Sequence, residues 1–172
     1  MAWKNDKKTN EESCKILVMR ELLHSLTCHA RNGTNRIFWY EWERDEVYRE
    51  TVITFRVHKS NPPKMLEENW FEMTLERCAD GFWKITYIGD VERRAHYTAV
   101  GIPDALIPEA SRVLGAAIRS SSNVGTKGTN EFRTQDADKM WTRLQTKGLA
   151  RYLRTEDYYI CDAAVAGQHP PR

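Results

Sequence analysis

The first stretch of the chain with a regular apolar pattern is residues 11–30. Its apolar side chains recur three and four positions apart, which places them along one stripe of an α-helix. Gly33 and the asparagines beside it favour the left-handed backbone that ends helices. The pattern therefore predicts a helix from Glu11 to about Ala30. The residues of its stripe are Ile16, Met19, Leu22, Leu23 and Leu26.

Four later stretches have patterns typical of extended chain, at residues 36–43, 50–58, 71–76 and 82–89. The first is rich in aromatic residues, and the next two alternate apolar with polar side chains. The fourth follows a tight-turn signal at Ala79-Asp80-Gly81. The first half is therefore predicted to be one helix followed by a four-stranded antiparallel meander.

The second half of the chain alternates helical and extended patterns. Residues 105–114 have a helical composition, but Pro108 cannot donate a hydrogen bond to the preceding turn. We therefore expect this helix to begin at Pro108. A short strand is expected at residues 116–120, and the Ser, Asn, Gly and Thr residues of 121–130 predict a flexible loop.

The last part of the chain has the clearest helix signals. Thr134 has the side chain of a helix N-cap, and acidic residues follow it in the first turn. Gly148 marks the end of this helix. Two short extended stretches, 149–153 and 158–161, then predict a closing β-hairpin.

The composition fits one folded domain. The chain has 172 residues, of which 41% are hydrophobic, and a chain of this kind buries a substantial core. Together with the element pattern, this predicts a single α+β domain over residues 11–162, with a mixed sheet. The N-terminus at residues 1–10 is expected to be disordered and the tail at 163–172 to be flexible.

Charge and cysteine usage narrow the classes of function. The 26 basic and 24 acidic residues nearly cancel, so the chain has no strong overall field for a nucleic acid or an anionic membrane. No apolar stretch approaches the roughly 20 residues of a membrane-spanning helix, and the polar N-terminus lacks the apolar segment of a secretory signal. The four cysteines form no CxxC pair. We therefore expect a cytoplasmic protein with reduced cysteines and no metal site.

Three motifs follow the fourth predicted strand. Gly101-Ile102-Pro103-Asp104-Ala105-Leu106 opens a helix, Ile118 to Asn123 is a strand that ends in Asn, and Ala137-x-x-Met140-Trp141-x-x-Leu144 lies in the last helix. In this order, over residues 83–162, the motifs resemble the C-terminal half of the GNAT superfamily of N-acetyltransferases. The resemblance implies that the protein moves an acetyl group from acetyl-CoA to an amine.

The resemblance also assigns a role to the turn before the second helix. Gly101 and Ile102 would contact the pyrophosphate of coenzyme A, because the N-terminus of a helix presents free N–H groups and a positive dipole. The turn departs from the family pattern at two positions. Thr98 stands where the family has a basic residue, and Pro103 stands where it has a second glycine.

Further candidate residues lie on either side of this turn. Arg93 and Arg94 are candidates to contact the phosphates in place of the missing basic residue, and Asn123 matches the Asn at the end of the family's strand. Asp90 or Glu92, just past the fourth strand, is the candidate base for the amine proton, with a nearby water as the alternative. The acceptor would be a small-molecule or a protein amine.

Two alternatives stay open. Trp141 stands where the family often has a tyrosine acid, and this favours an interaction protein without catalysis on the same scaffold. The last helix and hairpin also resemble the end of a winged-helix module, whose basic residues would contact nucleic acid. The long separation from the preceding helix makes nucleic acid the less favoured partner. The basic residues concerned are Arg133, Lys139, Arg143, Lys147, Arg151 and Arg154.

Overall fold

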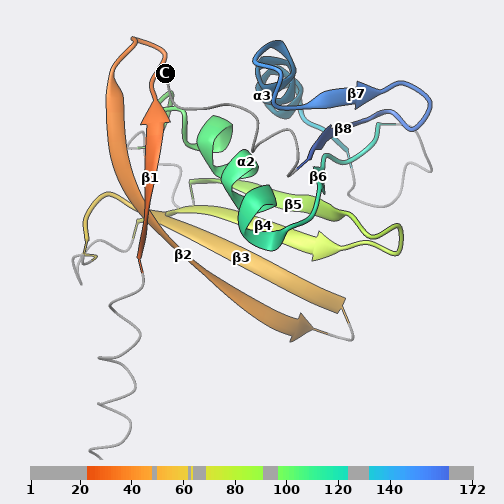
Figure 1. Cartoon of the computed structure of the whole chain (residues 1–172), viewed down its shortest axis with the longest axis horizontal. Helices are drawn as coiled ribbons and strands as arrows, with labels where there is room; N and C mark the ends of the chain where they lie inside the picture. Colours follow the sequence, from red (N-terminus) through yellow and green to blue (C-terminus); the bar gives the residue numbers. More distant parts are fainter. Residues whose placement is uncertain are drawn as a thin grey trace, which may run out of the picture.

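The computed structural model describes residues 23–47, 50–61, 63, 69–90, 97–123 and 132–162. Within these residues, eight strands form one mixed sheet and two helices pack on it (Figure 1). The strand order is β1-β2-β3-β4-β5-β6-β8-β7. The predicted α+β class is confirmed as a mixed open sheet with two helices. The predictions for residues 1–10 and 163–172 lie outside the described residues.

The predicted meander is present as four consecutive antiparallel strands. In β4, Phe71, Met73 and Leu75 are buried and the residues between them are half-buried. This alternation is that of a strand with one face on the core. The four strands are β2 Asn35–Val47, β3 Glu50–His58, β4 Phe71–Arg77 and β5 Trp83–Asp90.

The helix predicted for residues 11–30 is wrong at its C-terminal end. His24–His29 form strand β1, which pairs antiparallel with β2. Leu26 and Cys28 are buried, whereas the residues beside them in the strand are exposed. The long-range ladder with β2 therefore overrides the helical spacing of the apolar residues. The part of the predicted helix before residue 23 lies outside the described residues.

Helix α2, Ile102–Leu114, begins before the predicted start at Pro108. Ile102, Leu106 and Ile107 are completely buried, and burial of a side chain of this size contributes roughly 1.5–3 kcal/mol. Together they offset the roughly 3 kcal/mol that a proline costs inside a helix. The prediction of a helix that starts at Pro108 is wrong because tertiary packing outweighs the local preference.

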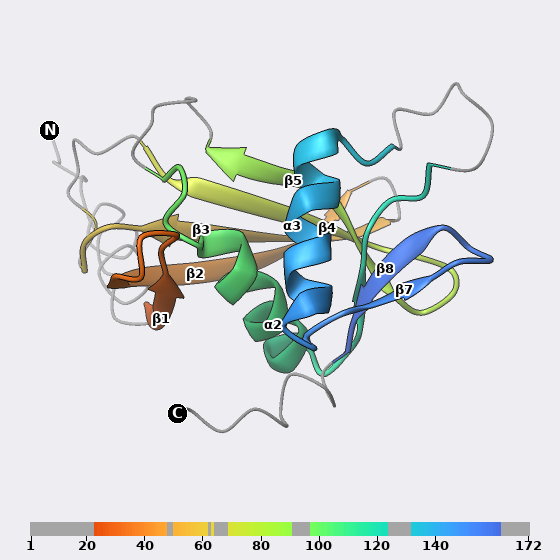
Figure 2. The same ribbon diagram turned by 90° about the horizontal axis from the view of Figure 1, so that it is seen from above.

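Helix α2 connects two parallel strands. It follows β5 and leads into β6, Ile118–Arg119, which is the short strand predicted at residues 116–120. A parallel pair needs a crossover of this kind, because the chain must return to the same end of the sheet. The helix lies beside β1, β6 and β8 (Figure 2).

Helix α3, Gln135–Thr146, is capped as predicted. The hydroxyl of Thr134 accepts a hydrogen bond of 3.2 Å from the N–H of Ala137. After Gly148, which has a left-handed φ of 72°, the predicted hairpin follows as β7, Arg151–Leu153, and β8, Tyr158–Cys161. Strand β8 pairs antiparallel with β6, so the hairpin extends the sheet.

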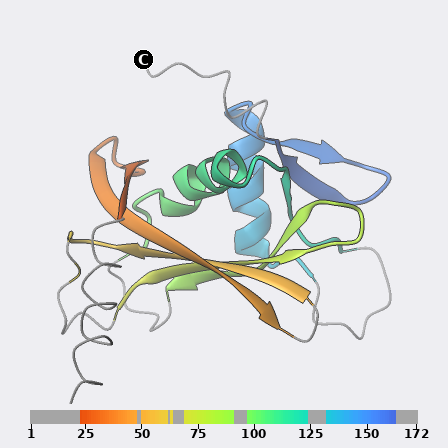
Figure 3. The ribbon, with the colours of Figure 1, turned by 60° about the horizontal axis from the view of Figure 1, so that its bottom comes forward.

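The two helices lie on the same side of the meander, so this part of the molecule has two layers (Figure 3). The buried hydroxyl of Tyr40 in β2 donates a hydrogen bond of 2.6 Å to Glu109 in α2. On the other face of the sheet, charged side chains of neighbouring strands pair, such as Arg56 with Glu72 at 3.8 Å. The core therefore lies between the helices and the strands.

The described cysteines are free thiols. Cys28 and Cys161 are completely buried, and burial raises the pKa of each thiol to about 12. Both side chains belong to the hydrophobic core. Neither of the described helices is long and apolar enough to cross a membrane.

Candidate functional site

Strands β5 and β6 pair over a short distance, and β5 continues beyond the last residue that pairs with β6. The register of β5 against β4 shifts between Thr74 and Leu75, where Thr86 is the extra residue of a β-bulge. A bulge bends the strand that carries it. The C-terminal part of β5 therefore has no β6 residue paired beside it among the described residues. The paired residues are Trp83 with Ile118 and Lys84 with Arg119.

A cavity of about 700 Å³ lies next to this unpaired end of β5. Its walls are the end of β5, the turn before α2, the first turn of α2 and one face of α3. A volume of this size is typical of small-molecule and cofactor sites. The residues that matter below are Asp90, Gly101, Asp104, Lys139, Arg143 and Lys147.

Three basic residues form a stripe on the face of α3 that lines the cavity. Lys139, Arg143 and Lys147 are four residues apart, which places them one above another on a helix. Two of them contact Asp104 at the start of α2, with 2.9 Å from Arg143 Nη2 to Oδ1 and 2.8 Å from Lys147 Nζ to Oδ2. These ion pairs hold the two helices together at the cavity.

The carboxyl group of Asp104 is ionised at neutral pH. Burial by itself would raise the pKa of Asp104, but the hydrogen bonds from Arg143 and Lys147 outweigh burial and lower the pKa below its ordinary value. The carboxylate in turn balances part of the positive charge on α3.

Lys139 and Arg31 add positive charge that is less tightly paired. The ammonium of Lys139 lies 3.3 Å from Asp136, and both side chains are exposed. An exposed pair of this kind contributes little free energy, so Lys139 can exchange Asp136 for another anion. Arg31 lines the same cavity from the β1–β2 connection and is exposed. The cavity is therefore lined by four basic side chains, Arg31, Lys139, Arg143 and Lys147, and by three acidic ones, Asp90, Asp104 and Asp136.

Gly101 is required by packing, with or without a ligand. It has a left-handed φ of 82° immediately before α2, a conformation that glycine adopts readily. A Cβ at this position would overlap the carbonyl oxygen of His29. Pro103, two positions further, lines the cavity but has no N–H to offer to an anion.

The structure brings two of the predicted site residues together. Asp90 is half-buried at the end of β5, and it lines the cavity together with Gly101. The side chain of Ile102 is completely buried in the core, so its backbone alone can face a ligand. Three further predicted residues lie outside the described part of the chain: Glu92, Arg93 and Arg94.

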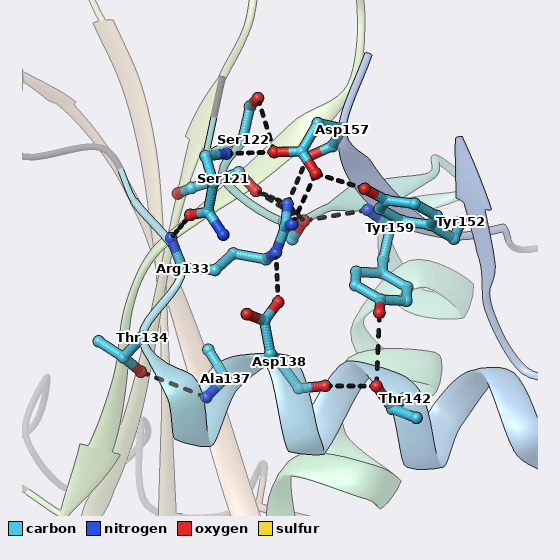
Figure 4. A network of polar contacts seen from close by, with 12 residues as sticks. Ser121, Ser122, Arg133, Thr134, Ala137, Asp138, Thr142, Tyr152, Asp157 and Tyr159 are labelled. Carbon is cyan, nitrogen blue, oxygen red and sulfur yellow. Dashed lines mark hydrogen bonds and ion pairs between the residues drawn. The ribbon is translucent and has the colours of Figure 1, made fainter. Parts of the chain in front are cut away.

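Asn123 lies elsewhere, hydrogen-bonded to Asp157 and Arg133. Figure 4 shows the cluster around Arg133, with Asp138 and Asp157 beside its guanidinium. The N–H of Asn123 donates a hydrogen bond of 2.6 Å to Asp157, and its side-chain oxygen accepts one of 2.8 Å from the N–H of Arg133. Asn123 is not among the residues that line the cavity. The structure therefore separates it from Asp90 and Gly101.

Arg133 joins three segments of the chain. Its side chain is 5% exposed and pairs with Asp138 in α3 at 2.7 Å and with Asp157 in the β7–β8 turn at 3.0 Å. It also donates a hydrogen bond of 2.6 Å to the carbonyl of Ser121, after β6. Burial by itself would raise the pKa of Asp157, but hydrogen bonds from Tyr152, Arg133 and the N–H of Asn123 lower it to about 2. Arg133 is therefore an internal brace, in the sense that its side chain links α3, the β7–β8 turn and the segment after β6.

Trp141 does not line the cavity. Its side chain is 2% exposed and stacks on Tyr159 of β8, with ring centroids 5.8 Å apart. Trp141 therefore belongs to the packing between α3 and the hairpin.

Two features of the cavity are not predicted from the sequence: the ion pairs of Asp104 and the stripe of basic residues on α3. In the sequence, Lys139, Arg143 and Lys147 enter only through the less favoured nucleic-acid alternative, although their four-residue spacing already places them on one face of a helix. Asp104 had no local signal, because its partners follow 39 and 43 residues later in the chain.

The fold and site define an α+β protein with a cavity beside the end of strand β5, lined by both basic and acidic side chains. Comparisons of the chain with models of protein families, with curated proteins and with solved structures give no match.

Proposed function

We propose that the protein is an acyl-CoA-dependent N-acyltransferase that transfers an acetyl group from acetyl-CoA to an amine. The observation that carries the proposal is the cavity of about 700 Å³ beside the unpaired end of β5, with basic residues on one wall. The element order β5, α2, β6, α3, β7 and β8 is also the order that the resemblance to the GNAT superfamily implies.

The basic residues fit the anionic phosphates of the proposed substrate. Arg143 and Lys147 are partly neutralised by Asp104, so Lys139 and Arg31 would contribute most to binding. A charge-assisted hydrogen bond contributes roughly 1.5–3 kcal/mol. Because Pro103 lacks an N–H, side chains replace part of what a helix N-terminus offers an anion.

Asp90 is the candidate base. In the proposed reaction the amine nitrogen attacks the carbonyl carbon of the thioester, a C–N bond forms and the C–S bond breaks. The nitrogen loses one proton, which Asp90 would take directly or through a water. The leaving thiolate gains one proton, so the products are an amide and a free thiol. Positioning of the amine beside the thioester supplies much of the remaining rate acceleration.

The position of Trp141 favours a second candidate, an interaction protein without catalysis. Among the described residues that line the cavity, the one tyrosine is Tyr97, whose hydroxyl donates a hydrogen bond of 2.7 Å to the carbonyl of Asn69. In the catalytic proposal the thiolate would therefore take its proton from solvent. Nucleic acid is less favoured, because Arg133 is buried and paired within the protein.

Binding of acetyl-CoA to the full chain, measured by isothermal titration calorimetry, tests the first step. We expect Lys139→Glu to weaken binding at least tenfold, since a charge-assisted contact contributes at least about 1.5 kcal/mol and about 1.4 kcal/mol corresponds to a factor of ten. Arg154→Glu is the matched control, because Arg154 is exposed in the β7–β8 turn and should leave affinity unchanged. Absence of binding at millimolar acetyl-CoA would contradict the proposal.

Thiol release in the presence of a panel of amines tests catalysis. The panel contains peptides with free N-termini, polyamines and aminoglycosides. We expect Asp90→Asn to lower kcat by roughly 10²-fold or more and to leave the affinity for acetyl-CoA within twofold of wild type. If the protein binds acetyl-CoA but no amine accelerates thiol release, the interaction protein replaces the enzyme as the favoured function.

A further inference from the structure

Strand β1 lies at one edge of the described sheet, and its backbone groups can be assigned to sides. The N–H of Ala30 donates a hydrogen bond of 2.9 Å to the carbonyl of Thr34, toward β2. The N–H of Arg31 instead donates one of 3.3 Å to the carbonyl of Ala99, away from β2. Odd-numbered residues at this end of the strand therefore face away from β2, since successive residues alternate.

The same alternation applies to the earlier residues of β1, because the register of β1 with β2 has no shift. Ser25 and Thr27 therefore direct their N–H and C=O groups to the open edge. Within the described residues no backbone hydrogen bond engages these two residues on that side. An open edge of this kind is a template for pairing with another extended chain.

A groove of about 610 Å³ runs between this edge and helix α2. Ser25 and Thr27 line one wall of the groove. Its apolar surface comes from β1, from α2 and from the segment between α3 and β7: Leu26, Ala105, Pro108 and Leu149. A sheet edge beside a helix thus offers backbone groups for affinity and an apolar surface for side chains.

The charges around the groove are arranged with the carboxylates inside and the cations outside. The side chain of Glu109 is 22% exposed and that of its partner Arg112 is 62% exposed. The side chain of Asp104 is 10% exposed and that of its partner Lys147 is 46% exposed. The exposed rim of the groove is therefore positive, which complements an acidic ligand.

We propose that this groove binds an extended, acidic peptide segment of a partner protein, which adds a strand to the edge of β1. A second copy of this chain is less suitable, because it would bring the same cations, Arg112 and Lys147, to a rim that is already positive. The inference goes beyond acyl transfer, since it requires neither acetyl-CoA nor Asp90.

Selection from a phage-displayed library of random dodecapeptides on the full chain, without acetyl-CoA, tests the inference. We expect the enriched peptides to be rich in Asp and Glu. Thr27→Pro should weaken their binding at least tenfold, since proline removes an outward N–H but no hydrogen bond of the β1–β2 ladder. Thr27→Val, which keeps the N–H, should bind within twofold of wild type. Arg112→Glu should weaken binding at least tenfold.

Hydrogen exchange of the wild-type chain provides a readout that does not depend on a variant folding. We expect the amide protons of Ser25 and Thr27 to become protected when a selected peptide is added. The inference is overturned if no peptide is enriched, if these amides stay unprotected or if basic peptides are selected. It is also overturned if sedimentation shows self-association that Thr27→Pro abolishes, because a second copy would then occupy the groove.

Discussion

Replacement of Arg133 by methionine should be among the most destabilising single changes in the described part of the protein. Methionine keeps much of the aliphatic length of the side chain but removes the guanidinium. It leaves Asp157, whose side chain is 13% exposed, without its cationic partner. Loss of one member of a buried ion pair costs roughly 3–5 kcal/mol. Because Tyr152 and the N–H of Asn123 still donate to Asp157, we expect about 3 kcal/mol.

Urea unfolding followed by far-UV circular dichroism measures this free energy. With an m-value of roughly 2 kcal/mol per M, a loss of about 3 kcal/mol lowers the midpoint by about 1.5 M. Arg154→Met, in the exposed β7–β8 turn, is the control and should change stability by less than about 0.5 kcal/mol. A midpoint shift below about 0.5 M for Arg133→Met would refute the assignment of Arg133 as a brace.

The same cluster predicts how stability depends on pH. The pKa of Asp157 falls from 3.8 to about 2 in the folded protein. Because the folded-state pKa is lowered, Asp157 stabilises the fold fully above about pH 4 and loses this contribution as the pH falls toward 2. Between about pH 5 and pH 2 the wild type should therefore lose more stability than Asp157→Asn. Equal losses in the two proteins would contradict this account.

Two further changes test the local structure around the helices by the same urea assay. Gly101→Ala should cost at least about 2 kcal/mol, because a left-handed alanine costs roughly 1–2 kcal/mol and its Cβ would also overlap His29. Gly33→Ala is the matched control, because Gly33 has the same φ of 82° but no atom near its added Cβ, so a smaller cost is expected. Thr134→Ala should cost about 1 kcal/mol through loss of the α3 cap, and Thr134→Ser should restore most of it. Equal costs at the two glycines, or no cost at Thr134, would show that these contacts do not stabilise the fold.

The elements that sequence predicts well are those specified by their own residues. The alternation of Phe71, Met73 and Leu75 with polar residues corresponds to the buried face of β4, and the Thr134 cap corresponds to the start of α3. In both cases neighbours within a few positions fix the structure. Element type therefore follows from local pattern where the local pattern and the tertiary contacts agree.

Elements that depend on distant partners are not predictable in the same way. Residues 24–29 continue a helical spacing, but their ladder with β2 makes them a strand. Asn123 matches a family motif, but its partner Asp157 lies in the hairpin turn. Arg133 is among the basic residues of the nucleic-acid alternative, but it is buried and pairs with Asp138 and Asp157. In these cases the residue types can be read from the sequence, but their partners come from distant segments and depend on the fold.

The proposed acyl-CoA site and the proposed peptide groove can be tested separately, although they meet at the start of α2. His29, Gly101, Asp104 and Lys147 line both cavities, so variants at these positions would disturb both. Lys139 lines the first cavity alone and Thr27 the second alone. Loss of acetyl-CoA binding in Lys139→Glu with unchanged peptide binding, and the reverse in Thr27→Pro, would establish two independent sites. Failure of either proposal then leaves the other standing, because each is tested at a residue that lines its own cavity alone.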